Sequence, residues 1–415
     1  MKLKKYSFGI GDRFGKQGKA QLSAVSQAKE LGIDIAPVWN KSFREHEIIG
    51  TNPDQVRKEA DQAVSSLGWK GSYHVDADHV GLKTVSSFIS GSDFFTLDVA
   101  DFIGKSADKD DIDHFLQKAA PYTGQLNLSQ LDQTINVTEK DIHDIAQKYL
   151  FAVKEAGRVY RCIVDQKQAD SFITEVSMDE TDMPQTPVEL FFILYMISLE
   201  NIPAQTIAPK FSGRFNKGVD YVGNPDQFRV EFEQDVAVIN LAVRTFSLPD
   251  NLKLSVHSGS DKFSIYPAIR GTLKKFDAGV HVKTAGTTWL EELIGLAEAG
   301  GDGLDLAVDL YCQAYAQREA LCKPYATVID IDEAKLPDPE DVQRWNSEKF
   351  TSTLRHNQDE ERYNPHFRQL LHVGYKVAAK MGERYMNELD KYEDIVSKNV
   401  TENILERHIK KIFPV

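Results

Sequence analysis

The strongest constraint on the fold is an alternation of short β-rich runs with longer segments of helical period. Eight such runs occur, near residues 5–10, 33–38, 73–78, 93–99, 171–178, 204–210, 253–258 and 279–284. Strands that alternate with helices form parallel sheets, because each helix carries the chain back to the start of the next strand. Eight strands in this pattern favour a closed (β/α)8 TIM barrel over an open doubly wound sheet.

Several of the intervening helices carry start signals. Thr186 and Glu189 flank a proline at the first helical position, which is the pattern of a capping box. Thr288 and Glu291 predict a second capping box ahead of an apolar helical face. We therefore expect one helix to follow the fifth strand and another to follow the eighth.

Two segments extend the barrel pattern. The chain between the fourth and fifth strands is long, and we expect a helical insertion at about residues 109–168, with a helix from about Thr138. From about Pro337 the sequence is charged and helix-prone, without strand-like runs. These patterns predict a catalytic barrel over residues 1–336 and a C-terminal helical extension over residues 337–415 that packs on it.

Charge and cysteine content narrow the class of protein. A formal net charge of -13 opposes binding to nucleic acid, so an anionic ligand has to meet a local group of basic side chains. The three cysteines form no CxxC pair, which argues against a disulfide scaffold and a thiolate zinc site and fits a reducing compartment.

The apolar segments of the sequence do not favour a location in a membrane or outside the cell. The first residues lack the apolar stretch of a secretion signal, and the most apolar run, from Leu190 to Leu199, is too short to cross a bilayer. We therefore expect a cytoplasmic protein that acts on a small molecule, with no nucleic acid or membrane partner. A homo-oligomer is left open.

The carboxyl ends of the predicted strands carry polar groups, and catalytic groups of a TIM barrel come from these ends. Imidazole nitrogens and a carboxylate can bind Zn, Mn, Ni or Co while leaving a position for substrate. His79, His257 and Glu175 follow or end apolar runs. We expect these three residues to hold a divalent metal ion.

Asp78 adjoins His79, so one residue can bind metal while the other exchanges protons with a substrate hydroxyl. We expect Asp78 to be the acid/base, with Glu175 as the other catalytic candidate. The alternative for Asp78 is a helix N-cap for a segment that begins near Val80. In an extended segment, the side chains of His74 and Asp76 share a face with that of Asp78.

Small and hydroxyl-bearing residues follow the last two strands, where backbone amides and hydroxyls often bind an anionic group. We expect four of them to contact substrate: Ser258, Gly259, Ser260 and Thr284. The cationic candidates for binding substrate are Lys210, Arg214 and Lys283, and Lys262 could add further positive charge. At least two of these four are expected only to face solvent.

A glycine-containing segment, 9–15, follows the first strand. It does not complete the GxGxxG pattern that binds a dinucleotide pyrophosphate. We therefore expect no NAD site there.

At Asp78-His79 and at His257-Ser258-Gly259-Ser260, the sequence resembles the class II metal-dependent sugar aldolases. In those enzymes an Asp-His pair follows one strand, a His-Gly-Gly-Ser-Gly segment follows a later one, and a threonine-containing anion loop follows the last. The order agrees. This chain has serine for the first glycine, and it has Lys210 near the region where those aldolases usually place a third imidazole.

Longer runs are similar to the tagaturonate epimerase family, over most of the chain. They are residues 210–218, 255–263, 283–289 and 363–372. The resemblance implies a divalent-metal enzyme that interconverts D-tagaturonate and D-fructuronate. Related members act on tagatose and fructose, so the expected substrate is a sugar acid or a ketohexose.

The two uronates differ at a hydroxyl-bearing carbon β to the ketone, so deprotonation next to the carbonyl cannot invert it. A retro-aldol cleavage followed by an aldol addition to the other aldehyde face can do so. Three alternatives are a lyase that releases its fragments, a transient oxidation by bound nicotinamide, and a non-catalytic aldolase-like partner subunit.

Overall fold

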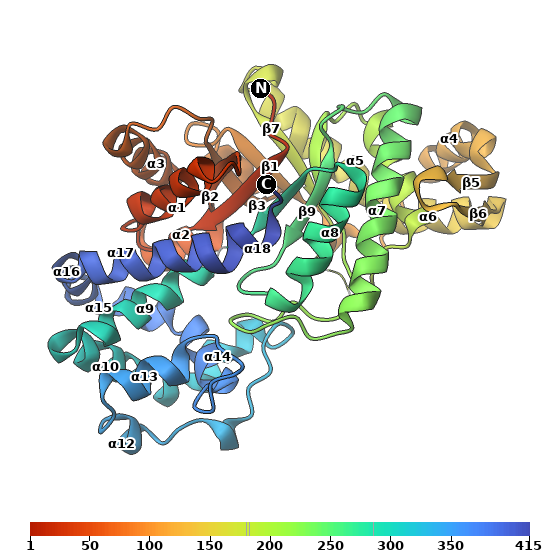
Figure 1. Ribbon diagram of the computed structural model, residues 1–415. Helices are drawn as coiled ribbons and strands as arrows, with labels where there is room; N and C mark the ends of the chain where they lie inside the picture. Colours follow the sequence, from red (N-terminus) through yellow and green to blue (C-terminus); the bar gives the residue numbers. More distant parts are fainter. Residues whose placement is uncertain (180, 182, 285) are drawn as a thin grey trace.

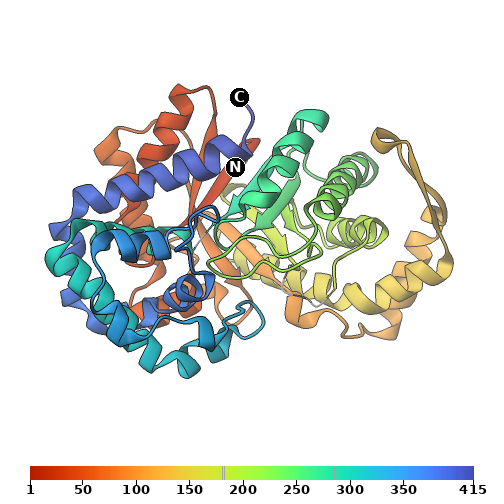
Figure 2. The ribbon, with the colours of Figure 1, turned by 60° about the horizontal axis from the view of Figure 1, so that its bottom comes forward.

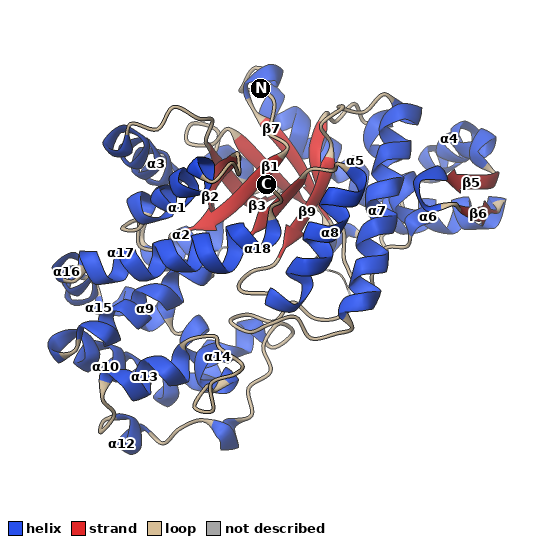
Figure 3. Cartoon of the chain, in the orientation of Figure 1, coloured by secondary structure: helices blue, strands red, loops and turns tan. Residues whose placement is uncertain are grey.

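The computed structural model describes residues 1–415 except 180, 182 and 285. Its centre is a closed barrel of parallel strands surrounded by helices (Figure 3), in the order β1-β10-β9-β8-β7-β4-β3-β2. The strands are β1 (Tyr6–Gly11), β2 (Ile35–Ser42), β3 (His74–Val80), β4 (Phe94–Asp98), β7 (Ile173–Ser177), β8 (Ala204–Ala208), β9 (Lys253–His257) and β10 (Val280–Lys283). Each overlaps one predicted run, so the predicted (β/α)8 barrel is confirmed.

Helices pack on the outer surface of the barrel. They are α1 (Gly18–Glu30), α2 (Phe43–Ile49), α3 (Pro53–Leu67), α6 (Pro187–Leu199), α7 (Pro225–Phe246), α8 (Tyr266–Phe276) and α9 (Thr287–Ala299). The main apolar core lies between strands and helices, and a smaller apolar cluster of Leu3, Ala36, Val38, Phe94 and Ile173 lies apart from it. Within the described ranges, no helix combines the length and apolarity that a bilayer crossing needs.

The two predicted helix starts have different outcomes. Thr186 caps α6 and forms the expected capping box with Glu189. The prediction for Thr288 is wrong, because α9 already begins at Thr287 and has no side-chain cap. The Thr288 hydroxyl instead accepts a hydrogen bond from Gln21 Nε2 at 2.9 Å, so a buried tertiary contact takes the place of the cap.

The insertion after β4 lies at the opposite side of the barrel from the C-terminal helices, as both ribbon views show (Figures 1 and 2). It contains α4 (Lys109–Ala119), an antiparallel hairpin of β5 (Gly124–Leu128) and β6 (Gln133–Val137), and α5 (Glu139–Val164). The helix α5 begins beside Thr138, as predicted, and the Thr138 side chain caps it. The prediction of a helical insertion at about residues 109–168 did not include this hairpin.

The C-terminal region forms a helical layer, as predicted. Its helices are α10 (Gly301–Ala316), α11 (Arg318–Cys322), α12 (Pro339–Val342), α13 (Ser347–Leu354), α14 (Pro365–Val373), α15 (Tyr375–Met381), α16 (Glu383–Lys391), α17 (Glu393–Glu402) and α18 (Lys410–Ile412). The helix α17 packs on α9 and α1, whereas α10 packs on α12, α14 and α15. The layer thus includes residues before 337, and the division at 336/337 stays a prediction.

One fully buried carboxylate, Asp261 in the β9–α8 connection, joins the barrel to this layer. Its Oδ2 lies 2.9 Å from Arg368 Nη2 and 3.1 Å from His356 Nδ1, and its Oδ1 lies 3.0 Å from His408 Nε2. Burial disfavours the anion, but Arg368 and the two imidazoles outweigh this effect and hold the pKa of Asp261 well below its ordinary value. The layer is therefore fixed over the carboxyl ends of the strands.

The Asp261→Asn substitution is expected to destabilise the protein by about 3–5 kcal/mol, because it leaves the buried Arg368 cation without a counter-charge. Urea unfolding measures the effect, with exposed Asp305→Asn in α10 as the matched control. A loss below about 1 kcal/mol, the range of a surface ion pair, would contradict this role.

Candidate active site

A buried ammonium group lies inside the barrel near the carboxyl ends of the strands. Lys283 Nζ lies 2.7 Å from Asp76 Oδ2, 2.8 Å from Asp78 Oδ1 and 3.3 Å from Glu175 Oε1. It also donates to Thr96 Oγ1 at 2.6 Å. Burial disfavours its charge, but the three carboxylates outweigh burial and raise the pKa of Lys283 well above its ordinary value. Lys283 is therefore a permanent internal cation.

The ring of His257 is held at both nitrogens by acidic side chains. Its Nε2 lies 2.8 Å from Glu175 Oε1, and its Nδ1 lies 3.2 Å from Asp179 Oδ1. The Nδ1 atom is buried yet makes no hydrogen bond to the described residues. A nitrogen without a hydrogen-bond partner, beside a carboxylate, is the arrangement expected of a metal ligand.

Glu175 is fully buried, and other groups occupy its oxygens. Besides His257 and Lys283, Oε1 accepts from Thr96 at 3.2 Å, and Oε2 accepts from Thr206 at 2.7 Å. Burial works against its negative charge, but Lys283 and His257 more than compensate and lower the pKa of Glu175 well below its ordinary value. This geometry makes Glu175 a support for His257 and Lys283.

The backbone at the end of β3 departs from regular strand geometry. His79 has φ 54°, and the pairing of β3 with β4 shifts register between Ala77 and Val80. Successive side chains of a regular strand point to opposite faces, whereas this irregularity lets the adjacent Asp78 and His79 approach one another, with Oδ1 and Nε2 at 3.8 Å. A non-glycine residue at positive φ is strained, and such strain is often found at functional sites.

His79 also approaches His257. The two ring centroids are 5.1 Å apart, and His79 Nδ1 lies 3.1 Å from Asp98 Oδ2. That carboxylate fixes the ring, and Nε2 makes no hydrogen bond to the described residues, so it is the second nitrogen of the site that could bind an ion. The same strand continues to Val80, and no helix begins at Asp78, so the alternative role of Asp78 as a helix cap is wrong.

Three residues converge on one point at the barrel mouth. Ligand atoms of His79, Asp179 and His257 all lie within 4.8 Å of one another. The site holds five carboxylates, against Lys283 and two imidazoles; these are Asp76, Asp78, Asp98, Glu175 and Asp179. The excess of negative charge and the ligand types both fit a divalent cation.

Asp179 is the residue that sequence reasoning missed. It lies just beyond the predicted fifth strand, and Ser177 donates a hydrogen bond to it at 2.5 Å. Glu175, Ser177 and Asp179 alternate along the chain, so the sequence did place Asp179 on the face of Glu175 and nearer to the mouth. The spacing of these residues along the sequence does not predict how close Asp179 lies to His79 and His257.

The predicted substrate-binding loops adjoin this cluster. The Ser258 hydroxyl donates to the Lys283 carbonyl at 2.6 Å, and that of Thr284 donates to the Gly9 carbonyl at 3.3 Å. Ser260 Oγ accepts from the Gly218 amide at 3.0 Å. These hydroxyls connect neighbouring loops, and Gly259, at φ 66°, turns the chain between them. Their contacts with substrate stay predictions.

The predicted cations are spread over different surroundings. Arg214 is exposed and pairs with Asp330 at 3.1 Å, away from the cluster. Lys262 is buried and donates to the Val219 carbonyl at 2.8 Å. Lys210 follows β8 and is partly exposed. Only Lys283 among these four contacts the carboxylates of the site in the described part of the chain.

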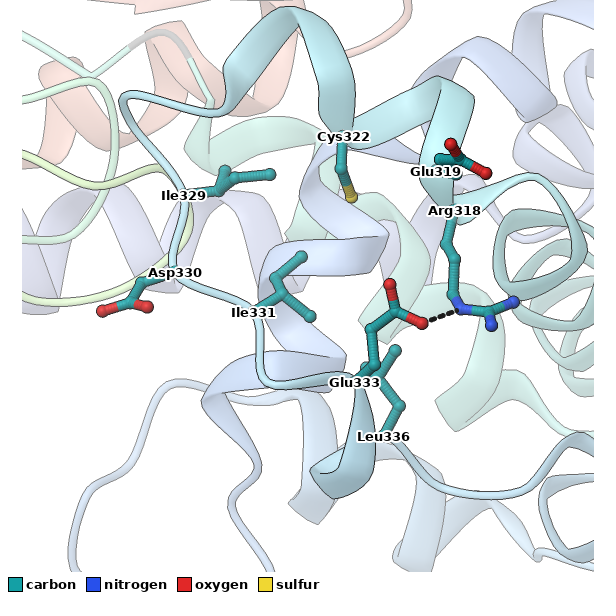
Figure 4. A pocket seen from close by; sticks show the side chains of 8 residues that line it. All are labelled: Arg318, Glu319, Cys322, Ile329, Asp330, Ile331, Glu333 and Leu336. Carbon is teal, nitrogen blue, oxygen red and sulfur yellow. Dashed lines mark hydrogen bonds and ion pairs between the residues drawn. The ribbon is translucent and has the colours of Figure 1, made fainter.

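Two cavities lie elsewhere. One, of about 250 Å³, is in the helical layer beside α11, where Arg318 and Glu333 pair at 2.7 Å (Figure 4). The other, of about 560 Å³, is lined by residues 2–5 and 250–254, at the amino ends of β1 and β9. Neither contains a residue of the histidine and carboxylate cluster.

Comparison with known proteins finds relatives that are similar over most of the chain. A curated tagaturonate/fructuronate epimerase of Thermotoga maritima is 29% identical over 418 residues, covering 97% of this chain and 80% of that one. The glycerol-bound crystal structure of the fructuronate-tagaturonate epimerase UxaE from Cohnella laeviribosi matches with a TM-score of 0.82 and 23% identity, over 99% of this chain and 82% of that one.

The native structure of the same Cohnella protein matches with a TM-score of 0.79 and 22% identity, over 99% and 82% of the two chains. At these identities the structures establish the fold. The family model for UxaE, tagaturonate epimerase, matches residues 1–412. The chain therefore belongs to the tagaturonate epimerase family and is an enzyme of the isomerase class.

Proposed function

We propose that this protein interconverts D-tagaturonate and D-fructuronate in the cytoplasm, by a divalent-metal-dependent retro-aldol and aldol reaction. The observation that carries the proposal is the convergence of His79, Asp179 and His257 beside the Asp78–Lys283 pair. The names of the Thermotoga and Cohnella relatives supply the substrates.

The metal would be held by His79, Asp179 and His257, with Zn, Mn, Ni and Co as candidates. Asp179 replaces Glu175 in the ligand set that we expected from the sequence, because other groups already occupy the oxygens of Glu175. When bound, such an ion supplies Lewis-acid polarisation of the ketone and its neighbouring hydroxyl. Glu175 orients His257 by accepting a hydrogen bond from its Nε2.

Asp78 is the group that we assign to proton transfer. It keeps 7% of its surface exposed, whereas Asp76 and Glu175 keep 2% and 0%, so Asp78 is the carboxylate best able to meet a substrate. Burial alone would raise its pKa, but Lys283 and His79 lower the pKa of Asp78 to about 2. It is therefore an anion at neutral pH, which is the protonation state that a base needs.

In the proposed reaction, Asp78 accepts the proton of the hydroxyl β to the ketone. The intervening carbon–carbon bond breaks, an aldehyde forms, and the electron pair of that bond remains on the ketone-bearing fragment. The aldehyde turns its other face, the bond re-forms, and Asp78 returns the proton. Lys283 stays protonated throughout and keeps Asp78 in place.

The test is epimerisation of tagaturonate by the purified protein, followed by NMR. Exhaustive chelation is expected to lower the rate by roughly 10³-fold, the effect of losing several kcal/mol of charge stabilisation, and added metal should restore it. Unchanged activity after chelation would contradict the metal scheme. Free three-carbon products without epimer would identify a lyase, and nicotinamide absorbance in the denatured protein would identify the oxidative route.

A further inference from the structure

A second group of polar side chains lies at the barrel mouth, on the side of β1 and β10. Arg13 comes from the β1–α1 loop, Lys217 from the β8–α7 loop and His372 from α14 of the helical layer. Lys217 Nζ lies 3.5 Å from the position that a Cβ on Gly259 would occupy. A Cβ on Gly286 would collide with the His372 ring, and the Gly286 amide donates to the Gly259 carbonyl at 3.0 Å.

The loop around Arg13 is rigidly held. Asp12 accepts from the amides of Gly15 at 2.8 Å and Gln17 at 2.6 Å, and Lys41 Nζ donates to the Arg13 carbonyl at 3.1 Å. These contacts fix the backbone on both sides of Arg13. Its side chain therefore projects from a defined position.

The guanidinium of Arg13 is held in place, but some of its hydrogen-bond donors have no partner among the described residues. Its central carbon lies 3.8 Å from the centre of the Tyr375 ring, and Nε lies 3.3 Å from Glu45 Oε1. The side chain is nine-tenths buried, yet Nε and Nη1 make no hydrogen bond to the described residues. Buried donors of this kind normally have partners, so an acceptor from a ligand is indicated.

The His372 ring also has a buried nitrogen without a hydrogen-bond partner among the described residues. It is 2% exposed, and its Nδ1 makes no hydrogen bond within the described chain. Burial, followed by the positive charges of Arg13 and Lys217, lowers the pKa of His372 well below its ordinary value. The ring is therefore neutral and offers an N–H without adding charge. Nearby Arg368 differs, because its donors already bind Asp261 and two carbonyls.

The two halves of the mouth thus have opposite character. His79, Asp179 and His257, from β3, the end of β7 and β9, lie in an acidic surrounding that suits a metal. The second group offers two cations and a neutral donor, with Glu45 as the one carboxylate paired to it among the described residues. A ligand that joins both halves needs ketone and hydroxyl oxygens at one end and an anion at the other.

We propose that Arg13, Lys217 and His372 form a subsite that binds the carboxylate of the substrate and selects a sugar acid over a neutral ketohexose. The inference rests on the proposed function. In the retro-aldol scheme, the carboxylate belongs to the aldehyde fragment. That fragment can rotate about the bond next to its aldehyde carbon while its carboxylate stays bound, so the subsite retains the fragment while its face is exchanged.

The test compares D-tagaturonate with tagatose, which lacks the carboxylate. Arg13→Gln and Lys217→Gln are expected to weaken calorimetric binding of the uronate, and its kcat/KM, by roughly 10- to 100-fold each, the size of a charge-assisted hydrogen bond. The kcat/KM for tagatose should stay within about twofold, because no anion is lost. Lys16→Gln, in the same loop and paired with Asp390, is the matched control.

The outcomes separate the two proposals. If the wild-type protein binds the uronate but does not epimerise it, and the Arg13 or Lys217 variant weakens this binding, the subsite stands. The proposed function would then be overturned. Any one of three results would overturn the subsite. They are equal losses for both substrates, uronate binding that the variants leave unchanged, and a wild-type protein that binds the uronate no more tightly than tagatose. Lys217 is less buried than Arg13, so its variant tests the idea even if the Arg13 variant fails to fold.

Discussion

Replacing Asp179 with asparagine is expected to abolish stoichiometric metal binding and to lower epimerase activity by roughly 10³-fold, because a neutral amide is a poor ligand and several kcal/mol of charge stabilisation are lost with the ion. A carboxylate oxygen of Asp179 lies within 4.8 Å of a ring nitrogen of His79 and of one of His257. Metal content by atomic emission and turnover of tagaturonate, measured on the same preparation, check the result.

Glu175→Gln is the informative comparison. Its side chain supports His257 and Lys283, so this variant should keep metal while its affinity falls by roughly 10- to 100-fold, as found for partners of metal ligands. Asp165→Asn, on the exposed end of α5, controls for a general effect of lost charge. Loss of metal from the Glu175 variant together with full metal content in the Asp179 variant would reverse the assignment.

The barrel was predictable because its strands are buried on both sides and read as apolar runs between helices. All eight runs became strands, with shifts only at their ends. The β5–β6 hairpin was not predictable in the same way. Its residues 124–137 alternate between exposed and buried over short stretches, and the strongly periodic helix that follows from Thr138 dominated the interpretation of the insertion.

The site was predicted in part, for a related reason. Strand ends can be recognised in the sequence, so it predicts Asp78, His79, Glu175 and His257 as candidates. Which carboxylate oxygen lies beside which imidazole nitrogen depends on how far along its strand each residue stands and on irregular backbone, as at the end of β3. Asp179 lies two strand repeats nearer to the mouth than Glu175, but the spacing does not show how close it comes to the two histidines. The positive φ of His79 has no clear sequence signal either.

Contacts between distant segments were beyond the sequence. Lys283 was expected to face substrate, but its place within β10 directs it into the barrel, where three carboxylates surround it. Arg13 and His372 come from opposite ends of the chain and lie near enough to interact electrostatically, because Asp261 fixes the helical layer over the mouth. No periodicity relates such residues, so only the folded chain brings them together.

Asp78→Asn is expected to lower kcat by roughly 10²- to 10⁴-fold, the usual contribution of a positioned acid/base, while metal content stays unchanged. Asparagine keeps the size of the side chain and an oxygen for Lys283, but it cannot accept a proton from the substrate hydroxyl. Because binding does not require that transfer, KM for tagaturonate should change far less than kcat.

The same variant decides which carboxylate moves the proton. Asp78 and Glu175 both contact Lys283, so a merely structural loss in that network would appear in each variant as weaker metal binding and lower stability. A chemical role predicts a different pattern, in which Asp78→Asn retains metal and thermal stability but does not turn over. Near-normal epimerisation by Asp78→Asn would remove Asp78 from the mechanism and leave Glu175, with its neighbour Thr96, as the route to be tested next.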